Sequence, residues 1–288
     1  MLRFKAFAKV NLVLEVLGGR ADGYHEIASV LQTVSLHDVL TLEPAGHITL
    51  NTNLPGLPDH ADIAMKAAQR LGEVTGCSRG VIIGLEKHIP VGAGLGGGSS
   101  DAAAVLRGLN KLWQLELTMG QMAAIGADLG SDVPFFIYGG TCLVEGRGER
   151  VTPLPDLEQA WFVLLRPGLA VAFGKTARLY SLIKSGHYTS GGLSTAMREQ
   201  FERRGEIKPG PIYNAFEKVA PDAFPGLDKY MQEFRRAGAT EVHLAGSGPV
   251  LFTLVHDEMK ASTIHANLLA GGLESYIATS VGREELGC

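Results

Sequence analysis

The sequence predicts an α+β protein of two lobes, and three parts of the chain lead to this prediction. Residues 4–51 alternate apolar and polar positions, as strands do when one face packs on a core. A glycine-rich loop follows, with segments of helical apolar spacing on both sides of it. Residues 242–280 read as strand, loop, strand, helix and strand, which gives the second lobe ferredoxin-like content.

The composition places the chain among ordinary globular proteins. It has 288 residues, of which 45% are hydrophobic and 19% charged, and its net charge is −4. This length suffices for one large or two medium domains with cores of their own. No apolar run approaches the roughly 18 residues of a membrane span, and the N-terminus lacks the apolar core of a signal peptide. We therefore expect a cytoplasmic protein without a membrane partner.

Charge and cysteine content narrow the class of partner. The mild acidity, without blocks of Lys or Arg, argues against nucleic acid. Cys77, Cys142 and Cys288 are widely spaced and lack the spacing of metal ligands, so we expect neither a disulfide nor a structural metal site. We expect a small-molecule substrate instead, and a monomer or a weak homodimer.

The first half of the chain predicts an antiparallel sheet followed by helices. Phe4 to Leu17 alternates well enough for one or two strands, although Lys9 and Asn11 interrupt its apolar character. Thr118 and Gln121 match a capping box, which predicts that a helix begins there and runs to about residue 129. Further strands are expected at 27–36, 39–43, 47–51 and 81–86, and further helices at 62–75 and 99–113.

The second half begins with an apolar run, Phe135 to Leu143, which we interpret as a strand. Pro153 to Pro155 is the expected boundary between a domain of residues 1–155 and a domain of residues 156–288. The polar segment 185–209 is interpreted as a solvated insert or a mobile helix. Further strands are expected at 161–165, 242–245, 250–255 and 275–280, and helices at 175–184, 211–219, 227–237 and 258–269.

The stretch Lys87 to Ala104, KHIPVGAGLGGGSSDAAA, has the features of a phosphate-binding loop. Glycine allows positive φ and has no Cβ, so consecutive backbone N–H groups can converge on a bulky anion. A helix predicted to begin near Ser99 adds the free N–H groups of its first turn and the positive end of its dipole. Ser99, Ser100 and Asp101 also offer hydroxyl groups and a candidate helix cap.

Two other phosphate-binding motifs fit the sequence less well. Gly92, Gly94 and Gly97 satisfy G-x-G-x-x-G, but residues 87–91 separate this motif from its strand, and helix follows helix after it. A Walker loop needs Lys directly after its last glycine. The stretch 168–176, GLAVAFGKT, comes near this pattern, but five residues separate its glycines where the Walker loop has four.

Four stretches resemble the GHMP kinase superfamily, and they follow one another in the order found in that family. They are AKVNLVLEVLGGRADGYHE (8–26), the loop P-x3-G-L-G-G-G-S-S-D-A-A (90–103), GSDVPFFIYGGTCLVEGRGE (130–149) and LAGSGPVLF (244–252). Together they are similar to the branch that phosphorylates the 2-hydroxyl of a cytidine diphosphate-linked methylerythritol in the non-mevalonate isoprenoid pathway. The resemblance implies the two-lobed GHMP kinase fold, with a ribosomal-protein-like N-terminal lobe, a ferredoxin-like C-terminal lobe and a deep cleft between them.

The resemblance implies ATP and Mg2+ as cofactors. Relatives usually carry Asn near the adenine where this chain has Asp62, which can accept but not donate a hydrogen bond, so the nucleotide preference stays open. No acidic cage for Mg2+ is visible, and Ser100 and water are the candidate ligands beside the triphosphate. The residues implied to bind ATP are Pro90, Gly92, Gly94, Leu95, Gly96, Gly97, Gly98, Ser99, Ser100 and Asp62.

Lys9 and Asp132 are the catalytic residues that the resemblance implies. From the pattern alone, the favoured interpretation of Lys9 is an edge-strand lysine, and that of Asp132 is a helix cap or a turn former. In the family, the Lys of A-K-[VIL]-N-L is catalytic and the Asp of G-S-D-V-P is the base that receives the proton of the acceptor hydroxyl. A Lys9 ammonium nearby would keep Asp132 ionised and offset charge on the transferring group.

Six residues are implied to bind the substrate: Asn11, Tyr24, His25, Tyr180, Gly246 and Ser247. Tyr24 and His25 would contact the cytidine end, although both could also be surface aromatics. Tyr180 is implied to stack on the cytosine, and a core tyrosine on a helix face is the alternative. The loop at 246–248 would close over the substrate phosphates, although a tight hairpin also accounts for it. It is no hydrolase elbow, because Ala245 stands where G-x-S-x-G needs glycine.

Three other functions remain to be separated from this one. A kinase for another small alcohol, such as homoserine or mevalonate, would lack the D-G-Y-H turn that residues 22–25 carry. A nicotinamide oxidoreductase would explain the G-x-G-x-x-G match, and bound cofactor would reveal it. A non-catalytic nucleotide-binding regulator is disfavoured because the chain retains both Lys9 and Asp132.

Overall fold

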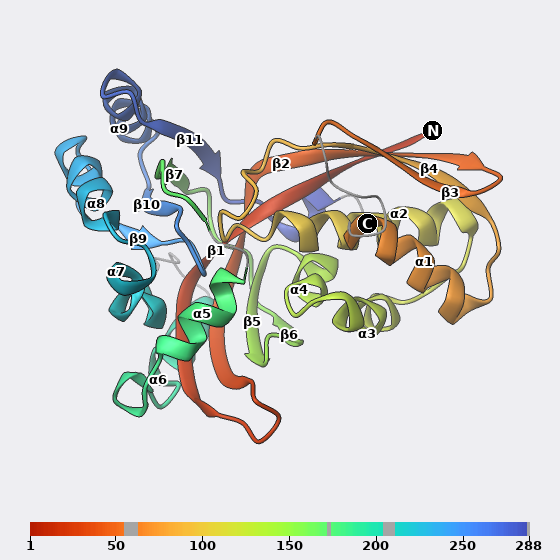
Figure 1. The fold of residues 1–288 in the computed structure, drawn as a ribbon, viewed down its shortest axis with the longest axis horizontal. Helices are drawn as coiled ribbons and strands as arrows, with labels where there is room; N and C mark the ends of the chain where they lie inside the picture. The colour runs from red at the N-terminus through yellow and green to blue at the C-terminus, as the bar shows by residue number, and fades with distance from the viewer. Residues whose placement is uncertain (55–62, 172–173, 204–210, 287–288) are drawn as a thin grey trace.

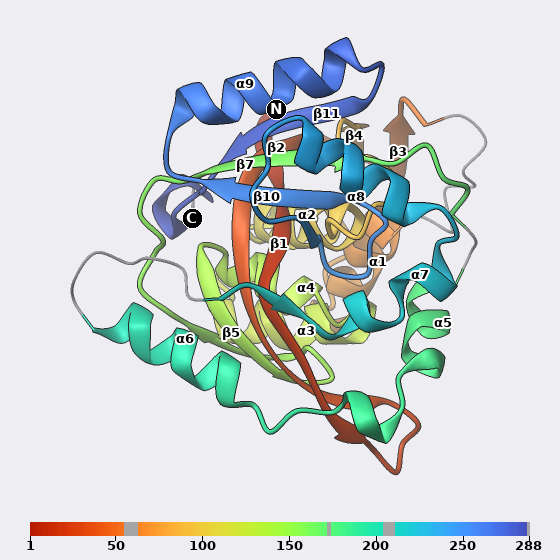
Figure 2. The same ribbon diagram turned by 90° about the vertical axis from the view of Figure 1, so that its left-hand side faces the viewer.

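The computed structural model describes residues 1–54, 63–171, 174–203 and 211–286. These residues form two sheets with helices packed against them, as the sequence predicts. In Figure 1 the helices α1 to α4 lie at one end of the molecule, and the second sheet with α8 and α9 lies at the other. Figure 2 shows the same arrangement from the side of the second sheet.

Two long strands, β1 (Leu2–Gly19) and β2 (His25–Ala45), form the centre of the first sheet. They pair antiparallel along almost their whole length (Figure 1), so the strands expected at 27–36 and 39–43 are one continuous strand. The chain from residue 6 to residue 16 is buried throughout, because β1 has protein on both of its faces. This burial makes the polar residues within that stretch conspicuous.

The expectation of an all-antiparallel opening is wrong at β3 (Ile48–Thr52), which pairs in parallel with β4 (Gly80–Glu86). The helix α1 (Ile63–Thr75) lies between them in the sequence. Parallel neighbours need such a crossover, whereas antiparallel neighbours can be joined by a short turn. The order of the first sheet is β3-β4-β2-β1-β8, and β5 and β6 extend it beside β2.

Helices α2 (Gly97–Trp113), α3 (Met119–Leu129) and α4 (Val133–Tyr138) pack with α1 against the first sheet. The capping box at Thr118 is confirmed, because its side chain and that of Gln121 both bond the backbone of the other residue. The strand expected at 135–143 is wrong: α4 occupies its first half, and β5 (Thr141–Gly146) begins later. A short apolar run has no clear period, and Pro134 in the first turn favours the helix.

The second sheet has the order β11-β7-β10-β9 and carries helices on its outer side (Figures 1 and 2). Its strands are β7 (Trp161–Arg166), β9 (His243–Leu244), β10 (Leu251–Val255) and β11 (Glu274–Thr279). The remaining elements are β6 (Arg150–Pro153), α5 (Lys175–Leu182), η2 (Ser185–His187), α6 (Gly192–Glu202), β8 (Tyr213–Asn214), η3 (Ala215–Lys218), α7 (Ala220–Ala223), α8 (Leu227–Arg236), α9 (Glu258–Ala270) and η4 (Arg283–Leu286).

One further expectation about the second half is wrong. The helix expected at 211–219 is a short strand, β8, followed by the 3-10 turn η3, and β8 pairs in parallel with β1. The segment 185–209, expected to be a solvated insert or a mobile helix, contains the helix α6, whose Met197 and Phe201 are buried against the protein. Its apolar residues are few but lie on one face of the helix, so they suffice to dock it.

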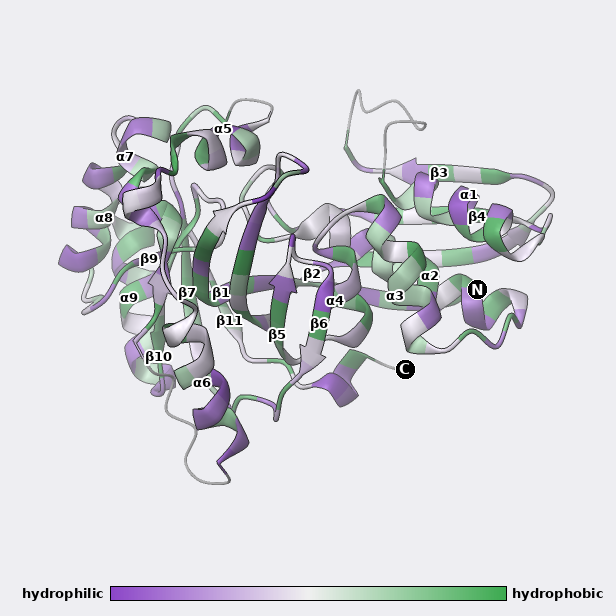
Figure 3. Ribbon diagram, turned by 90° about the horizontal axis from the view of Figure 1, so that it is seen from below, coloured by the Kyte–Doolittle hydropathy of each residue, from purple (hydrophilic) through white to green (hydrophobic). Residues whose placement is uncertain are grey.

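A shared hydrophobic cluster joins the two sheets. Val10 and Leu12 of β1 belong to the same cluster as Phe162 of β7 and Phe252 of β10. Figure 3 shows the corresponding hydrophobic bands along the central strands and hydrophilic turns on the outside of α8. None of the described helices combines the length and the apolar character that a membrane span needs.

Candidate active site

The glycine loop adopts the conformation that its composition predicts. Gly92, Gly94 and Gly96 have φ values of 70°, 85° and 76°, in the left-handed region that favours glycine. The helix begins at Gly97, two residues earlier than expected, and its first internal bond runs from the Ser100 N–H to the Gly96 carbonyl. The N–H groups of residues 97–99 therefore have no acceptor within the helix and are available to an anion.

The loop lies directly beside β1. The Lys9 N–H donates to the Leu95 carbonyl at 3.0 Å. A Cβ atom added at Gly96 would lie 2.7 Å from the ring of Phe136 and 3.2 Å from Cγ of Lys9. Only glycine fits there, and the lysine stem therefore runs along the start of the helix.

A buried ion cluster supports the loop from behind. The Lys87 ammonium donates to both Asp38 and Asp101, and the N–H of Ile89 donates to Asp38 at 2.7 Å. The sequence suggested Asp101 as a candidate helix cap, and this is wrong. The helix begins earlier, and the Asp101 carboxylate faces Lys87. Burial raises the pKa of Asp101 well above its usual range, although the charge of Lys87 opposes that shift.

Lys9 and Asp132, which are far apart in the sequence, meet beside this loop. The Lys9 ammonium lies 3.7 Å from Oδ2 of Asp132, and the two side chains are 6% and 40% exposed. Asp132 precedes the first residue of α4, but its side chain makes no capping hydrogen bond. Its carboxylate is therefore free to face the cavity and the lysine, which the alternative interpretation as a cap would not explain.

Polar groups within the sheet hold the lysine in place. The Lys9 ammonium donates to Oδ1 of Asn11 at 2.7 Å, and Nδ2 of Asn11 donates to the Ser29 hydroxyl at 2.8 Å. Ser29 in turn donates to the Val13 carbonyl. Lys9 and Asn11 share one face of β1, as their spacing of two residues predicts. This chain fixes the position of the ammonium on a rigid strand.

The turn at 246–248 forms another wall of the site. A Cβ atom at Gly246 would lie 2.7 Å from Nζ of Lys9 and 2.8 Å from Oδ1 of Asn11. The side chain of Asn214 donates to the carbonyls of Leu244 and Gly246, at 2.9 and 2.8 Å. The turn is therefore held by Asn214 on one side and lies against Lys9 on the other.

The predicted substrate residues line one cavity of about 630 Å3 together with Lys9 and Asp132. At one end of it the rings of His25 and Tyr180 stack, with their centroids 4.9 Å apart and their planes at 18°. Tyr180 also packs edge-on against Phe216, as the alternative of a core tyrosine on a helix face predicts. Tyr24 is 53% exposed at the rim. Of the predicted substrate residues, Asn11, Tyr24, His25, Tyr180, Gly246 and Ser247 all line this cavity.

Sequence reasoning missed two cations at this site. The Arg147 guanidinium lies 4.8 Å from the ring centroid of Tyr24 and lines the cavity. It stands in the G-R-G-E stretch that contributed to the resemblance, so its position could have been noted. Lys175, the lysine of the near-Walker stretch, donates to the Ser247 hydroxyl at 2.8 Å.

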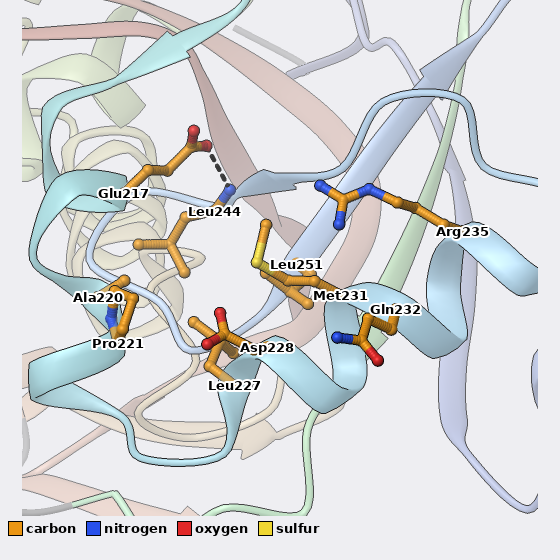
Figure 4. A pocket seen from close by; sticks show the side chains of 10 residues that line it. All are labelled: Glu217, Ala220, Pro221, Leu227, Asp228, Met231, Gln232, Arg235, Leu244 and Leu251. Atoms are coloured by element: carbon orange, nitrogen blue, oxygen red, sulfur yellow. Dashed lines mark hydrogen bonds between the residues drawn. The ribbon is translucent and has the colours of Figure 1, made fainter.

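A second cavity, of about 390 Å3, lies in the C-terminal lobe between η3, α7 and α8 (Figure 4). Its apolar floor includes Leu227, Leu244 and Leu251, and Glu217 at its edge accepts a hydrogen bond from the Leu244 N–H. None of the predicted site residues lines it. Lys9, Asp132 and the predicted substrate residues line the other cavity instead.

The remaining predicted residues concern the nucleotide and the metal. Asp62 lies outside the described residues. Ser100 is buried in the first turn of α2, and Ser99 is half-buried beside it. The described residues hold no group of three or more His, Cys, Asp or Glu side chains arranged to bind a metal ion. If Mg2+ binds beside the triphosphate, Ser100 remains the protein ligand that the resemblance suggests.

Comparison with known proteins agrees with this geometry. The chain matches the family models described as GHMP kinases N terminal domain, over residues 62–140, and GHMP kinases C terminal, over residues 196–272. A solved homoserine kinase from Cytophaga hutchinsonii shares the fold, with a TM-score of 0.71 over 97% of this chain and 94% of that one, at 19% identity. The two matched domains and the shared fold show that the chain belongs to the GHMP kinase superfamily.

More similar relatives define its place within that superfamily. A 4-diphosphocytidyl-2-C-methyl-D-erythritol kinase from Dehalococcoides mccartyi is 45% identical over 282 residues, covering 98% of this chain and 99% of the relative. One of the same name from Geobacillus sp. is 38% identical, with coverage of 93% and 92%. A crystal structure of a 4-(cytidine 5'-diphospho)-2C-methyl-D-erythritol kinase has a TM-score of 0.81 at 35% identity and covers 98% and 100%. The chain belongs to the 4-diphosphocytidyl-2-C-methyl-D-erythritol kinase family.

Proposed function

We propose that this kinase transfers the γ-phosphoryl group of ATP to the 2-hydroxyl of 4-diphosphocytidyl-2-C-methyl-D-erythritol. The observation that carries the proposal is the meeting of Lys9 and Asp132 beside the glycine loop, at the end of a cavity with stacked aromatic rings. The printed names of the similar kinases support the choice of substrate. We assign nucleotide binding and catalysis mainly to residues 1–155, and substrate binding mainly to residues 156–288.

In this proposal the glycine loop holds the triphosphate. Its left-handed glycines and the free N–H groups of residues 97–99 face outward from the start of α2, where the helix dipole also favours an anion. Phosphoryl transfer requires little covalent chemistry from the protein, so holding and aligning the phosphates is the main task. Mg2+, when bound, neutralises charge on the triphosphate oxygens.

Asp132 acts as the base in this mechanism, and Lys9 provides electrostatic stabilisation. The half-exposed carboxylate accepts the proton of the acceptor hydroxyl and orients the oxygen toward the γ-phosphorus. The Lys9 ammonium, held by Asn11 at 2.7 Å, offsets negative charge on the transferring group. Because the lysine is on a central strand and its stem packs on Gly96, it stays aligned with the loop.

The aromatic end of the cavity is assigned to the cytosine. His25 and Tyr180 present parallel ring faces 4.9 Å apart, a separation that leaves no room for a base between them, so a base must stack on the outer face of one ring or separate the pair. Tyr24 and Arg147 lie at the rim of the cavity, where the Arg147 guanidinium can bind the diphosphate of the substrate. Cytosine and reacting hydroxyl are then bound at opposite ends of one cavity.

The test is ADP release from ATP with a panel of alcohols. We expect turnover with 4-diphosphocytidyl-2-C-methyl-D-erythritol and little with unlinked methylerythritol phosphate, homoserine or mevalonate. Equal turnover with the unlinked alcohol would refute the cytidine assignment while leaving the kinase activity intact. Absence of ADP release with every alcohol would refute the catalytic roles of Lys9 and Asp132.

A further inference from the structure

Lys175 is a half-buried cation that the proposed mechanism does not use. It is the first residue of α5, and its ammonium donates to the Ser247 carbonyl at 3.0 Å, to the Ser247 hydroxyl at 2.8 Å and to the Gly248 carbonyl. An ammonium has three N–H donors and no acceptor. The three bonds therefore use its whole donor capacity on a single turn of the chain.

That turn is in contact with the catalytic groups. An added Cβ at Gly246 would lie 2.7 Å from Nζ of Lys9, and one at Gly94 would lie 2.6 Å from the Gly248 nitrogen. The turn at 246–248 is therefore enclosed between Lys175 on one side and Lys9 and the glycine loop on the other. A shift of the turn would displace the catalytic lysine, the glycine loop or both.

The same helix reaches the other end of the cavity. Thr176, next to Lys175, donates to the Ser247 hydroxyl at 3.0 Å, and Tyr180 one turn later stacks on His25. Lys175 thus connects the helix that carries the aromatic end of the site to the turn that borders its reacting end. Substrate binding at one end can only be aligned with chemistry at the other if this connection holds.

The electrostatic surroundings show that the cation is retained at a cost. Burial and, to a lesser extent, the positive charge of Lys9 together lower the pKa of Lys175 to about 8, while the charge of Asp132 opposes the shift. These two groups are the charged residues that act on it from the elements packed against α5. A neutral side chain could tie the turn without this penalty, so the positive charge itself calls for an explanation.

We propose that Lys175 is a positioning residue for phosphoryl transfer, which holds the 246–248 turn against Lys9 and the glycine loop and adds a second positive charge beside the catalytic pair. The proposal rests on the kinase mechanism given above. Loss of the ammonium releases the turn, so the acceptor hydroxyl and the γ-phosphorus lose their alignment. Misplacement of about 1 Å can reduce turnover by about 100-fold.

Deprotonation weakens the same connection. A neutral amine has two N–H donors, so it leaves one of the three acceptors on the turn without a partner. The second positive charge disappears at the same time. Activity should therefore fall as the pH rises through about 8, the pKa of Lys175, whereas a lysine that only fills space would give no such dependence.

The experiment measures kcat and KM for ADP release with ATP and 4-diphosphocytidyl-2-C-methyl-D-erythritol, from pH 6.5 to 9.5, in Lys175→Met and Lys175→Arg. Lys229→Met, which removes an exposed lysine on α8, is the matched control. Circular dichroism and thermal unfolding show whether each variant folds. We expect Lys175→Met to lose at least 10-fold in kcat, with KM for ATP within about threefold of the original value.

The arginine variant separates a positioning role from a structural one. Arginine keeps its charge over this pH range, so Lys175→Arg should recover part of kcat and lose the alkaline limb of kcat/KM. The inference is overturned if Lys175→Met has kcat within twofold of the original enzyme, or if the alkaline limb persists unchanged in Lys175→Arg. If the original enzyme itself releases no ADP with this alcohol, the proposed function fails instead.

Discussion

Replacing Asp132 by Asn removes the carboxylate while keeping the size of the side chain. The structure indicates that this change is tolerated by the fold, because the side chain makes no capping hydrogen bond and is 40% exposed. Its ion pair with Lys9, at 3.7 Å and partly in water, should contribute less than about 1 kcal/mol to stability. Lys9 keeps its bond to Asn11 at 2.7 Å in the variant.

The catalytic effect of Asp132→Asn should be far larger. An amide cannot accept the proton of the acceptor hydroxyl, and loss of a positioned general base typically costs about 10²- to 10⁴-fold in rate. That range corresponds to about 3–5 kcal/mol in the activation free energy. The assay is ADP release at saturating ATP and alcohol, with the thermal unfolding midpoint measured on the same preparations.

Asp128→Asn is the matched control for this variant. Asp128 is an exposed carboxylate on α3 that pairs with Arg70 and does not line the cavity. We expect its turnover to stay within twofold of the original enzyme. A folded Asp132→Asn enzyme with turnover as high as that of the control would show that Asp132 is not the base, and the mechanism would have to be abandoned.

Three further predictions concern the turn, the aromatic end and the support of the glycine loop. Gly246→Ala places a Cβ 2.7 Å from Nζ of Lys9 at a φ of 72°, so we expect a stability loss of about 1–2 kcal/mol, measured by urea unfolding, and a lower kcat. Tyr180→Ala should raise KM for the cytidine-linked alcohol by about 5- to 150-fold, the equivalent of 1–3 kcal/mol of stacking, while Tyr180→Phe should keep KM near its original value. Lys87→Met leaves two buried carboxylates without a cation and should cost about 3–5 kcal/mol at neutral pH. Burial raises the pKa of Asp101 in the folded state, so the protonated form favours folding below that pKa and the benefit is lost as the pH rises through it. The Lys87→Met deficit in urea unfolding should therefore shrink at acid pH, and a deficit independent of pH would contradict the buried-charge explanation.

The sequence predicted the parts of the fold whose local signals agree with their tertiary environment. The capping box at Thr118 and the left-handed glycines of the loop depend on neighbours a few residues away, so the pattern alone identifies them. The apolar run at 135–143 gave the wrong element, because burial on all sides removes the period that separates helix from strand. The parallel pairing of β3 could have been inferred from the helix that follows it.

The site itself was predictable only where residues resemble those of a known family. Lys9 and Asp132 each have an ordinary explanation in the sequence, and only the folded chain brings the lysine of β1 to the residue before α4. The only local signal at Lys175 is the near-Walker stretch, which does not indicate its contacts with the 246–248 turn. Its partners are 72 and 73 residues further along the chain, and no periodicity connects a helix start to a turn at that distance.

The arrangement of charges in the cavity follows from what a kinase of this class must bind. Lys9 and Arg147 line the cavity and Lys175 bonds the turn that borders it, whereas Asp132 is the carboxylate beside Lys9. A purely structural design would pair each buried cation with a carboxylate, as Lys87 is paired with two. Lys175 bonds neutral carbonyl and hydroxyl oxygens instead, which satisfies its donors but leaves its charge uncompensated. Such a cation costs stability on its own, and in the proposed mechanism its positive charge beside Lys9 and Asp132 offsets part of the negative charge of the phosphate groups.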